Sequence, residues 1–167
     1  MINIVLYKPE IPANTGNIIR TCVGINARLH LIKPLGFSLD EKSIKRSATN
    51  HIYDCNYFVY ENYDDFVNKN KPKNIYFLTR YGNKNYFDIS YPQDEELYFV
   101  FGSESKGIDK GILKKNIDNC FRIPASDKIR SLNLSNVVSI VGYEASRQRN
   151  FEGLSFKEPF KGEDYLK

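Results

Sequence analysis

The chain has 167 residues, of which 41% are hydrophobic, 14% aromatic and 26% charged, which is typical of one folded domain and excludes a disordered or fibrous protein. Its net charge of +4 is compatible with an anionic partner but does not require one. The longest apolar run, 97–101, is too short to span a bilayer, and the first residues carry no signal-peptide pattern. We therefore expect a cytoplasmic protein with no membrane partner.

Five segments rich in Ile, Val, Phe and Tyr predict buried strands, and they cover residues 2–7, 28–34, 74–80, 96–102 and 119–124. Apolar residues at helical spacing predict a helix over 16–26, with Thr15 as its N-cap. Shorter helices are predicted over 41–48, capped by Asp40, and over 63–69. Strands thus alternate with helices, which predicts an α/β fold whose mostly parallel sheet has helices on both faces.

The last predicted helix covers 132–149, and much of its circumference is uncharged. A helix that is apolar on more than one face must bury more than one face, in the core or against a second subunit. From Phe151 onward no periodicity is seen. We therefore expect one domain over residues 1–150 and a peripheral tail over 151–167.

Cysteine and histidine are too few and too scattered for a disulfide framework or a metal site. The three cysteines and two histidines are Cys22, Cys55, Cys120, His30 and His51, and none of them forms a ligand pair at zinc spacing. No metal is therefore expected.

Three polar segments are candidates for a functional site. In the first, Asn14, Asn17 and Arg20 follow one another at three-residue spacing around a helix start, where backbone N–H groups favour an anion. Arg20 in that position can bind a phosphate. The alternative is an ordinary solvated arginine on an amphipathic helix.

The second segment, GSESKGIDKG at 102–111, lies between a predicted strand and a helix. Ile108 and Asp109 occupy the positions where a phosphate-binding loop needs lysine and a hydroxyl residue, and no strand leads into a G-x-G-x-x-G pattern. ATP hydrolysis, GTP hydrolysis and nicotinamide dinucleotides are therefore disfavoured. The alternative is that Gly102 and Gly107 only permit a tight turn.

The third segment, 123–148, contains Ser131, Asn133, Ser135 and Asn136, which is more than one helix cap requires. These residues are interpreted either as tying down a buried loop or as part of a ligand site.

The sequence resembles the SPOUT superfamily in three motifs and in their order along the chain. The motifs are NTGNIIR (14–20), FGSESKGI (101–108), and RIP with RSLNLSNVVSIVGYEA (122–124, 130–145). Within this superfamily, residues 1–150 are most similar to the small bacterial tRNA wobble-position 2'-O-methyltransferases. The resemblance implies a Rossmann-like parallel sheet with a C-terminal trefoil knot, a homodimer, and S-adenosylmethionine bound in the knot.

The resemblance also assigns roles to individual residues. It implies contacts with the methyl donor at Leu78, Gly102, Ile123 and Ser131, and catalytic roles for Arg20 and Tyr143. Support of loops or RNA is implied for Asn17, Lys106, Arg130 and Asn136.

Two positions depart from the family pattern, which has proline and arginine where this chain has Ser103 and Lys106. Lysine keeps the positive charge but loses the two-pronged geometry of arginine.

The implied reaction transfers a methyl group to the ribose 2'-hydroxyl of nucleotide 34, a cytidine or modified uridine, in the anticodon loop of leucine tRNAs. Because a guanidinium keeps its proton at neutral pH, we expect Arg20 to orient the 2'-oxygen and stabilise its developing charge. No DNA partner is expected. The alternatives are a ribose methyltransferase for ribosomal RNA or another tRNA loop, and a knotted RNA-binding module without catalysis.

Overall fold

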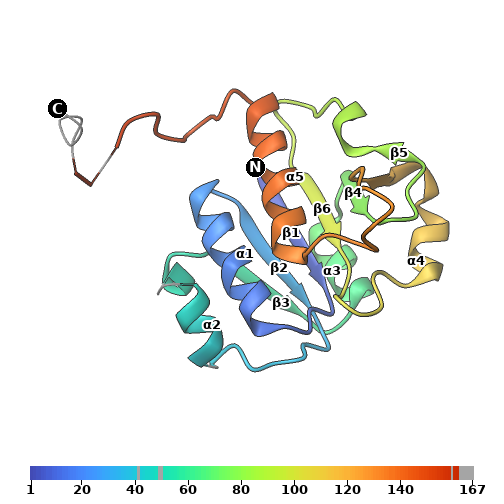
Figure 1. The fold of residues 1–167 in the computed structure, drawn as a ribbon, viewed down its shortest axis with the longest axis horizontal. Coiled ribbons are helices and arrows are strands. Elements are labelled where there is room, and N and C mark those ends of the chain that lie inside the picture. Colours follow the sequence, from blue (N-terminus) through green and yellow to red (C-terminus); the bar gives the residue numbers. More distant parts are fainter. Residues whose placement is uncertain (41, 49–50, 159, 162–167) are drawn as a thin grey trace.

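The computed structural model describes residues 1–40, 42–48, 51–158 and 160–161. Its centre is a seven-stranded sheet with the order β3-β2-β1-β6-β4-β7-β5 (Figure 1). Each pair of neighbouring strands in this sheet is parallel. The strands are β1 (Ile2–Tyr7), β2 (Arg28–Ile32), β3 (Tyr57–Tyr60), β4 (Asn74–Leu78), β5 (Lys84–Asn85), β6 (Leu97–Phe101) and β7 (Cys120–Arg122).

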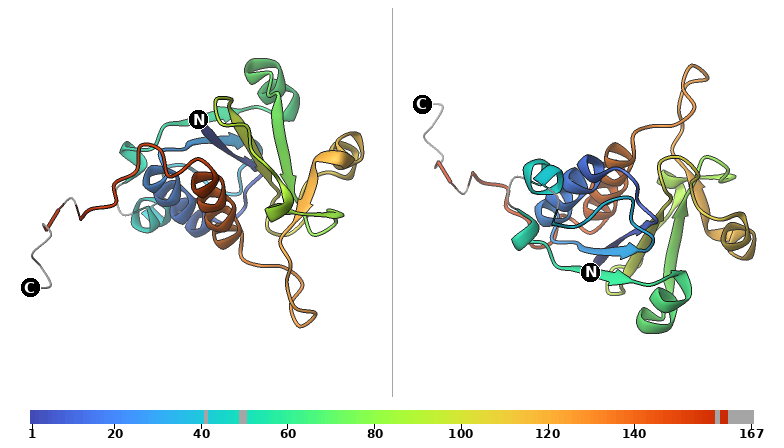
Figure 2. Two further views of the ribbon diagram at one scale, coloured as in Figure 1. Left: turned by 90° about the horizontal axis from the view of Figure 1, so that it is seen from above. Right: turned by 90° about the horizontal axis from the view of Figure 1, so that it is seen from below.

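Helices cover both faces of the sheet (Figures 1 and 2). The α-helices are α1 (Pro12–Gly24), α2 (Lys42–Ser47), α3 (Tyr63–Asn70), α4 (Lys110–Lys115) and α5 (Leu134–Gln148), and 3-10 turns are described at η1 (His51–Tyr53), η2 (Tyr86–Asp88) and η3 (Ile117–Asn119). Helices α1, α2 and α5 pack on one face, while α3 and α4 pack on the other. This arrangement confirms the predicted parallel α/β class. The trefoil knot stays a prediction.

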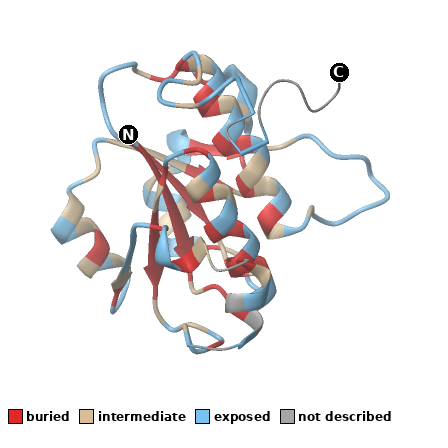
Figure 3. Cartoon of the chain, turned by 90° about the vertical axis from the view of Figure 1, so that its left-hand side faces the viewer, coloured by how far each residue is buried: buried red, intermediate tan, exposed pale blue. Residues whose placement is uncertain are grey.

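The core follows from side-chain alternation along strands that are buried on both faces. In β1, Ile4 and Leu6 pack with α1 and α5, whereas Val5 and Tyr7 pack with α3 and α4. Figure 3 shows the central strands as almost entirely buried. A strand that is apolar at every position is what a sheet covered on both faces requires.

The five predicted strands are all present, but each of the last four is shorter than predicted. Strands β3 and β5 were not predicted. Strand β3 lies at one edge of the sheet, where Tyr57 and Phe58 are 38% and 42% exposed. Strand β5, at the other edge, has only two residues, too few for any pattern.

The predicted N-cap at Thr15 is wrong. Helix α1 begins at Pro12, and Thr15 is buried inside it with a hydroxyl that has no hydrogen-bond partner. Proline suits the first helical position because its missing N–H needs no partner there. The structure agrees with the predicted helices at α2, α3 and α5, although Glu41, which follows the predicted cap Asp40, lies outside the described residues.

The end of α5 is fastened to the segment between β5 and β6. Gln148 donates to the carbonyl of Ile89 (2.8 Å) and accepts from the backbone N–H of Tyr91 (3.0 Å). Buried Arg149 donates to the carbonyls of Pro92 (2.6 Å) and Glu95. Beyond them, the described tail residues have no helix or strand. The tail starts against the body, where the carbonyl of Gly153 accepts from the side-chain amide of Asn26 (2.9 Å), and its later part extends outward (Figures 1 and 2). No helix among the described residues is long and apolar enough to cross a membrane.

A buried histidine in β2 links three strands. The Nε2 atom of His30 lies 3.0 Å from Oδ1 of Asn3, and its Nδ1 lies 2.8 Å from the hydroxyl of Tyr60. Asn3 uses its amide nitrogen to donate to the carbonyl of Leu97, so its Oδ1 is an acceptor and His30 carries its proton on Nε2. Burial lowers the pKa of His30 to about 4.

This pKa predicts an acid-sensitive contribution to stability. Between pH 6.5 and about 4 the unfolded chain binds a proton at His30 that the folded chain does not, so stability falls as the pH falls through this window. From pH 7 to pH 4.5, the wild type should lose about 2 kcal/mol more unfolding free energy than His30→Gln. Urea denaturation at both pH values tests this, with His51→Gln as the control; equal losses in wild type and His30→Gln would contradict it.

Candidate functional site

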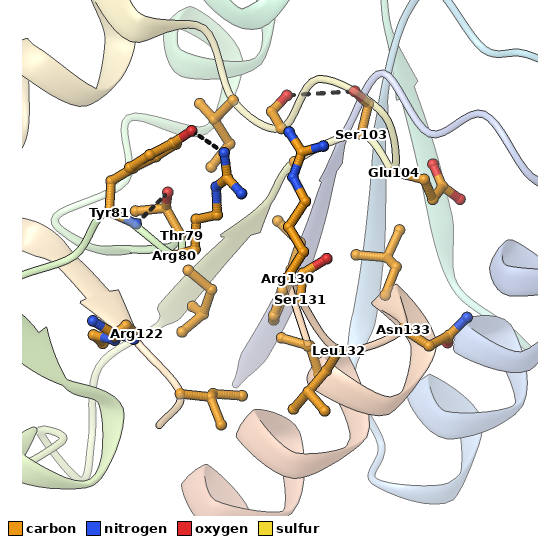
Figure 4. A pocket seen from close by; sticks show the side chains of 18 of the residues that line it. Thr79, Arg80, Tyr81, Ser103, Glu104, Arg122, Arg130, Ser131, Leu132 and Asn133 are labelled. Atoms are coloured by element: carbon orange, nitrogen blue, oxygen red, sulfur yellow. Dashed lines mark hydrogen bonds between the residues drawn. The ribbon is translucent and has the colours of Figure 1, made fainter. Parts of the chain in front are cut away.

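A pocket of about 740 Å³ lies where β4, β6 and β7 end (Figure 4). Parallel strands present their carboxyl ends at one edge of the sheet, which is where α/β proteins bind ligands. The walls come from the residues after β4, from the loop between β6 and α4, and from the segment between β7 and α5. Part of this last segment projects from the body (Figure 2).

The structure brings together the four residues expected to contact the methyl donor. Leu78, Gly102, Ile123 and Ser131 all line this pocket. Leu78 is buried, Ile123 is half-buried and Ser131 is exposed. The volume lies within the range of small-molecule sites. The apolar side chains of Leu78 and Ile123 suit the faces of an adenine ring, and the main-chain groups of the loops suit its polar edge. The pocket therefore fits S-adenosylmethionine.

Gly102 is required by the loop that follows it. A Cβ atom at this position would lie 2.3 Å from the carbonyl carbon of Gly107. The loop is closed by the bond from the N–H of Gly107 to the carbonyl of Ser103 (2.9 Å), and Gly107 has a φ of 72°. The tight-turn interpretation therefore holds here, and contact of Gly102 with a donor stays a prediction.

One carboxylate connects the three polar segments. Glu104 accepts from the backbone N–H groups of Glu10 (2.8 Å) and Ile11 (3.1 Å) and from the side-chain amide of Asn14 (3.0 Å). Asn14 in turn accepts from the amide of Asn133 (3.0 Å), which is the N-cap of α5. No local pattern singles out Glu104, because its partners lie about ninety positions earlier in the chain.

The loop after β6 is also held at its far end. The hydroxyl of Tyr7, at the end of β1, donates to the carboxylate of Asp109, and Lys8 lies 3.4 Å from the same carboxylate. The hydrogen bond from Tyr7 lowers the pKa of Asp109, and Lys8 adds to this effect. The carboxylate therefore stays ionised and fixes the loop to the sheet.

The residues expected to catalyse lie elsewhere. Arg20 and Tyr143 line a second hollow, of about 930 Å³, together with Asn17 and Asn136. It lies over the outer surfaces of α1 and α5, which are joined by a contact of 3.1 Å between the hydroxyls of Thr21 and Ser139. Within one chain, the structure does not bring Arg20 and Tyr143 into the first pocket.

His51 also lines the second hollow, with its Nδ1 3.2 Å from a carboxylate oxygen of Asp54. No motif contains this histidine, so the sequence offered no signal for it. Tail residues, including Phe156 and Phe160, line the same hollow.

The first pocket has a positive mouth. The charged residues that line it are Arg80, Lys106, Arg122, Arg130 and Glu104. Because Glu104 is engaged by N–H donors, the cations favour an anionic ligand. In the part of the chain that is described, no group of three or more His, Cys, Asp or Glu residues is placed to hold a metal ion.

Comparison with known proteins identifies relatives along most of the chain. The profile of the SpoU rRNA Methylase family matches residues 1–143. A protein of Listeria monocytogenes, provisionally named as a tRNA (cytidine(34)-2'-O)-methyltransferase, is 49% identical over 94% of this chain and 93% of its own length. The tRNA (cytidine(34)-2'-O)-methyltransferase of Saccharophagus degradans is 42% identical over 92% of this chain and 99% of its own length.

A solved structure agrees with these relatives. This structure is described as giving structural insights into the 2-OH methylation of C/U34 on tRNA. It superposes on this chain with a TM-score of 0.84 and is 31% identical, over 90% of this chain and 97% of that chain.

The packing at Gly102 predicts a position-specific loss of stability. Gly102→Ala should lower the unfolding free energy by about 2–4 kcal/mol, because the new Cβ meets rigid backbone. Gly111→Ala is the matched control: apart from its chain neighbours and the backbone of its own helix, no atom lies within 4 Å of its Cβ position in α4, so stability should stay equal or rise by up to about 1 kcal/mol. Urea denaturation measures both, and equal effects would contradict the packing argument.

Proposed function

The chain belongs to the SpoU rRNA Methylase family, and from this membership we propose that it transfers a methyl group from S-adenosylmethionine to the ribose 2'-hydroxyl of nucleotide 34 in tRNA. The observation that carries the proposal is the pocket that collects Leu78, Gly102, Ile123 and Ser131 at the ends of the strands. The names of the relatives from Listeria monocytogenes and Saccharophagus degradans support the same reaction and nucleotide.

The donor pocket would hold S-adenosylmethionine between Leu78 and Ile123, with Ser131 at its edge. Bound there, this cofactor supplies a methyl group on a positively charged sulfur. Because loss of that methyl group would leave a neutral sulfur and would need no acid, the residues of this chain would have to act on the nucleophile. A ribose hydroxyl is a weak acid and must be aligned and relieved of its proton.

Arg20 acts on the nucleophile in this proposal. It is exposed on α1 and lines the same hollow as Tyr143. Because a guanidinium keeps its proton, Arg20 orients the 2'-oxygen and stabilises its developing negative charge. An RNA phosphate beside Arg20 takes part in accepting the proton.

The site becomes complete in a homodimer. Arg20 follows Asn14, which lines the donor pocket, by six positions, or about 9 Å along a helix axis. Tyr143, which lines the same hollow as Arg20, is 48% exposed, and α5 also exposes Ile140 (37%). Pairing these faces of two chains would bury the apolar side chains and bring Arg20 of one chain to the donor pocket of the other.

The finer substrate assignment rests on the family resemblance. We assign leucine tRNAs with a cytidine or modified uridine at position 34, presented in an anticodon loop from which a nucleotide can be splayed out. A tRNA substrate implies a cytoplasmic enzyme. The family description favours one alternative, the same reaction on ribosomal RNA.

The substrate is tested by incubating the purified protein with labelled S-adenosylmethionine and total RNA from a deletion strain. We expect label on the 2'-oxygen of nucleotide 34 of tRNA, located by mapping the modified nucleotide. Label on ribosomal RNA or in another tRNA loop would replace the proposed substrate. RNA binding without transfer would indicate a module that no longer catalyses.

The shared site is tested by mixing two inactive variants. Arg20→Ala should lower the single-turnover rate by about 100-fold, and Ser131→Trp should block the donor pocket. A heterodimer with one copy of each, isolated through two different tags, contains one complete site and should recover about half of the wild-type activity. If Arg20 acted on the pocket of its own chain, the heterodimer would stay inactive.

A further inference from the structure

An exposed tyrosine lies at the mouth of the donor pocket without a packing role. Tyr81 follows β4 by three residues, lines the pocket and is 69% exposed. Its ring therefore contributes little to the core. Exposure of one tyrosine is common by itself, but a ring at the mouth of a pocket can offer its face to a flat ligand.

The ring is nevertheless held in place. The guanidinium of Arg80 lies 4.6 Å from the centre of the Tyr81 ring and donates a hydrogen bond to its hydroxyl. The backbone N–H of Tyr81 donates to the hydroxyl of Thr79 (3.3 Å). A ring that is fixed before binding loses little entropy when a ligand stacks on it.

The turn that carries the ring is rigid as well. The N–H of Gly82 donates to the carbonyl of Thr79 (3.1 Å). A Cβ atom at Gly82 would lie 2.5 Å from the carbonyl carbon of Phe121. The turn is therefore pressed against β7, and Tyr81 cannot move far from the pocket.

Two arginines lie at the same end of the pocket as the ring. Figure 4 shows the guanidinium groups of Arg80 and Arg130 pointing toward the same end of the pocket, while Arg122 lies apart from them. Both Arg80 and Arg130 are exposed. An aromatic face beside cations is the combination that binds single-stranded nucleic acid, because the bases stack and the phosphates are neutralised.

We propose that Tyr81, supported by Arg80, is a stacking platform for a nucleobase of the RNA substrate. The partner is a base next to the methylated nucleotide, stacked on the face of Tyr81 that Arg80 leaves free. The proposal rests on the proposed function for the choice of RNA. The adenine of the methyl donor is the other flat heterocycle at this site, but the apolar walls that suit it, Leu78 and Ile123, lie deeper than the exposed ring.

The first experiment separates RNA binding from donor binding. Tyr81→Ala should raise KM for an anticodon stem-loop about ten-fold, because one base stack is lost, and leave the Kd of S-adenosylmethionine unchanged in calorimetry. Tyr81→Phe keeps the ring and should stay within about two-fold of wild type. Tyr53→Ala is the matched control, since Tyr53 is 77% exposed and does not line the pocket.

The second experiment detects the stack directly. The chain contains no tryptophan, so Tyr81→Trp and Tyr53→Trp each introduce the only tryptophan, which can be excited selectively over the tyrosines. The stem-loop should quench Trp fluorescence in Tyr81→Trp and not in Tyr53→Trp, and the methyl donor alone should quench neither.

Each outcome bears on the proposal. Quenching by the donor alone, or weaker donor binding in Tyr81→Ala, would assign the ring to adenine and overturn the proposal. An unchanged KM for RNA in Tyr81→Ala, together with no quenching by RNA in Tyr81→Trp, would also overturn the proposal. If the wild type methylates the stem-loop and Tyr81→Ala matches it, the platform fails while the proposed function stands. If RNA quenches Tyr81→Trp but the wild type transfers no methyl group, the proposed function fails and the platform stands.

Discussion

The architecture of the site depends on the carboxylate of Glu104. It accepts hydrogen bonds from the chain just before α1 and from Asn14, and Asn14 holds the N-cap of α5. Negative charge at the start of a helix is favoured by the helix dipole, so this contact is stabilised by more than its hydrogen bonds. Glu10 adds a reciprocal contact, because its carboxylate accepts from the N–H (3.0 Å) and the hydroxyl (2.6 Å) of Ser105, so the loop after β6 and the start of α1 hold each other from both sides.

Two surfaces result from this arrangement. The pocket at the strand ends collects the residues expected to hold a methyl donor, and the outer faces of α1 and α5 collect Arg20 and Tyr143. The same two helices are joined to each other and to the pocket through Asn14 and Asn133. One hydrogen-bonded frame therefore supports both the pocket and the helix faces that the proposed homodimer would use.

Sequence patterns predicted the elements whose cause is local. Strand β1 is apolar at nearly every position, and α5 has a strong helical period, so both were found close to their observed bounds. The start of α1 was misplaced because Thr15 was taken as a side-chain cap, whereas the observed N-cap, Ile11, has no capping side chain and its N–H is bound by the remote Glu104; Pro12 was the local signal for the true start. The pocket residues came from a family resemblance, whereas the exposed and braced ring of Tyr81 depends on packing that no local pattern records.

The sheet order also constrains how the chain acquires its structure. Strand β5 pairs with β7, and β7 inserts between it and β4, although β7 follows both in sequence. While the polypeptide is being synthesised, residues 84–85 therefore have no neighbouring strand until residues 120–122 have emerged from the ribosome. Such late pairing between distant segments slows folding, because loop-closure entropy is lost before the contacts form. The edge of the sheet that ends in β7 and β5 can therefore form only after about 120 of the 167 residues have been made.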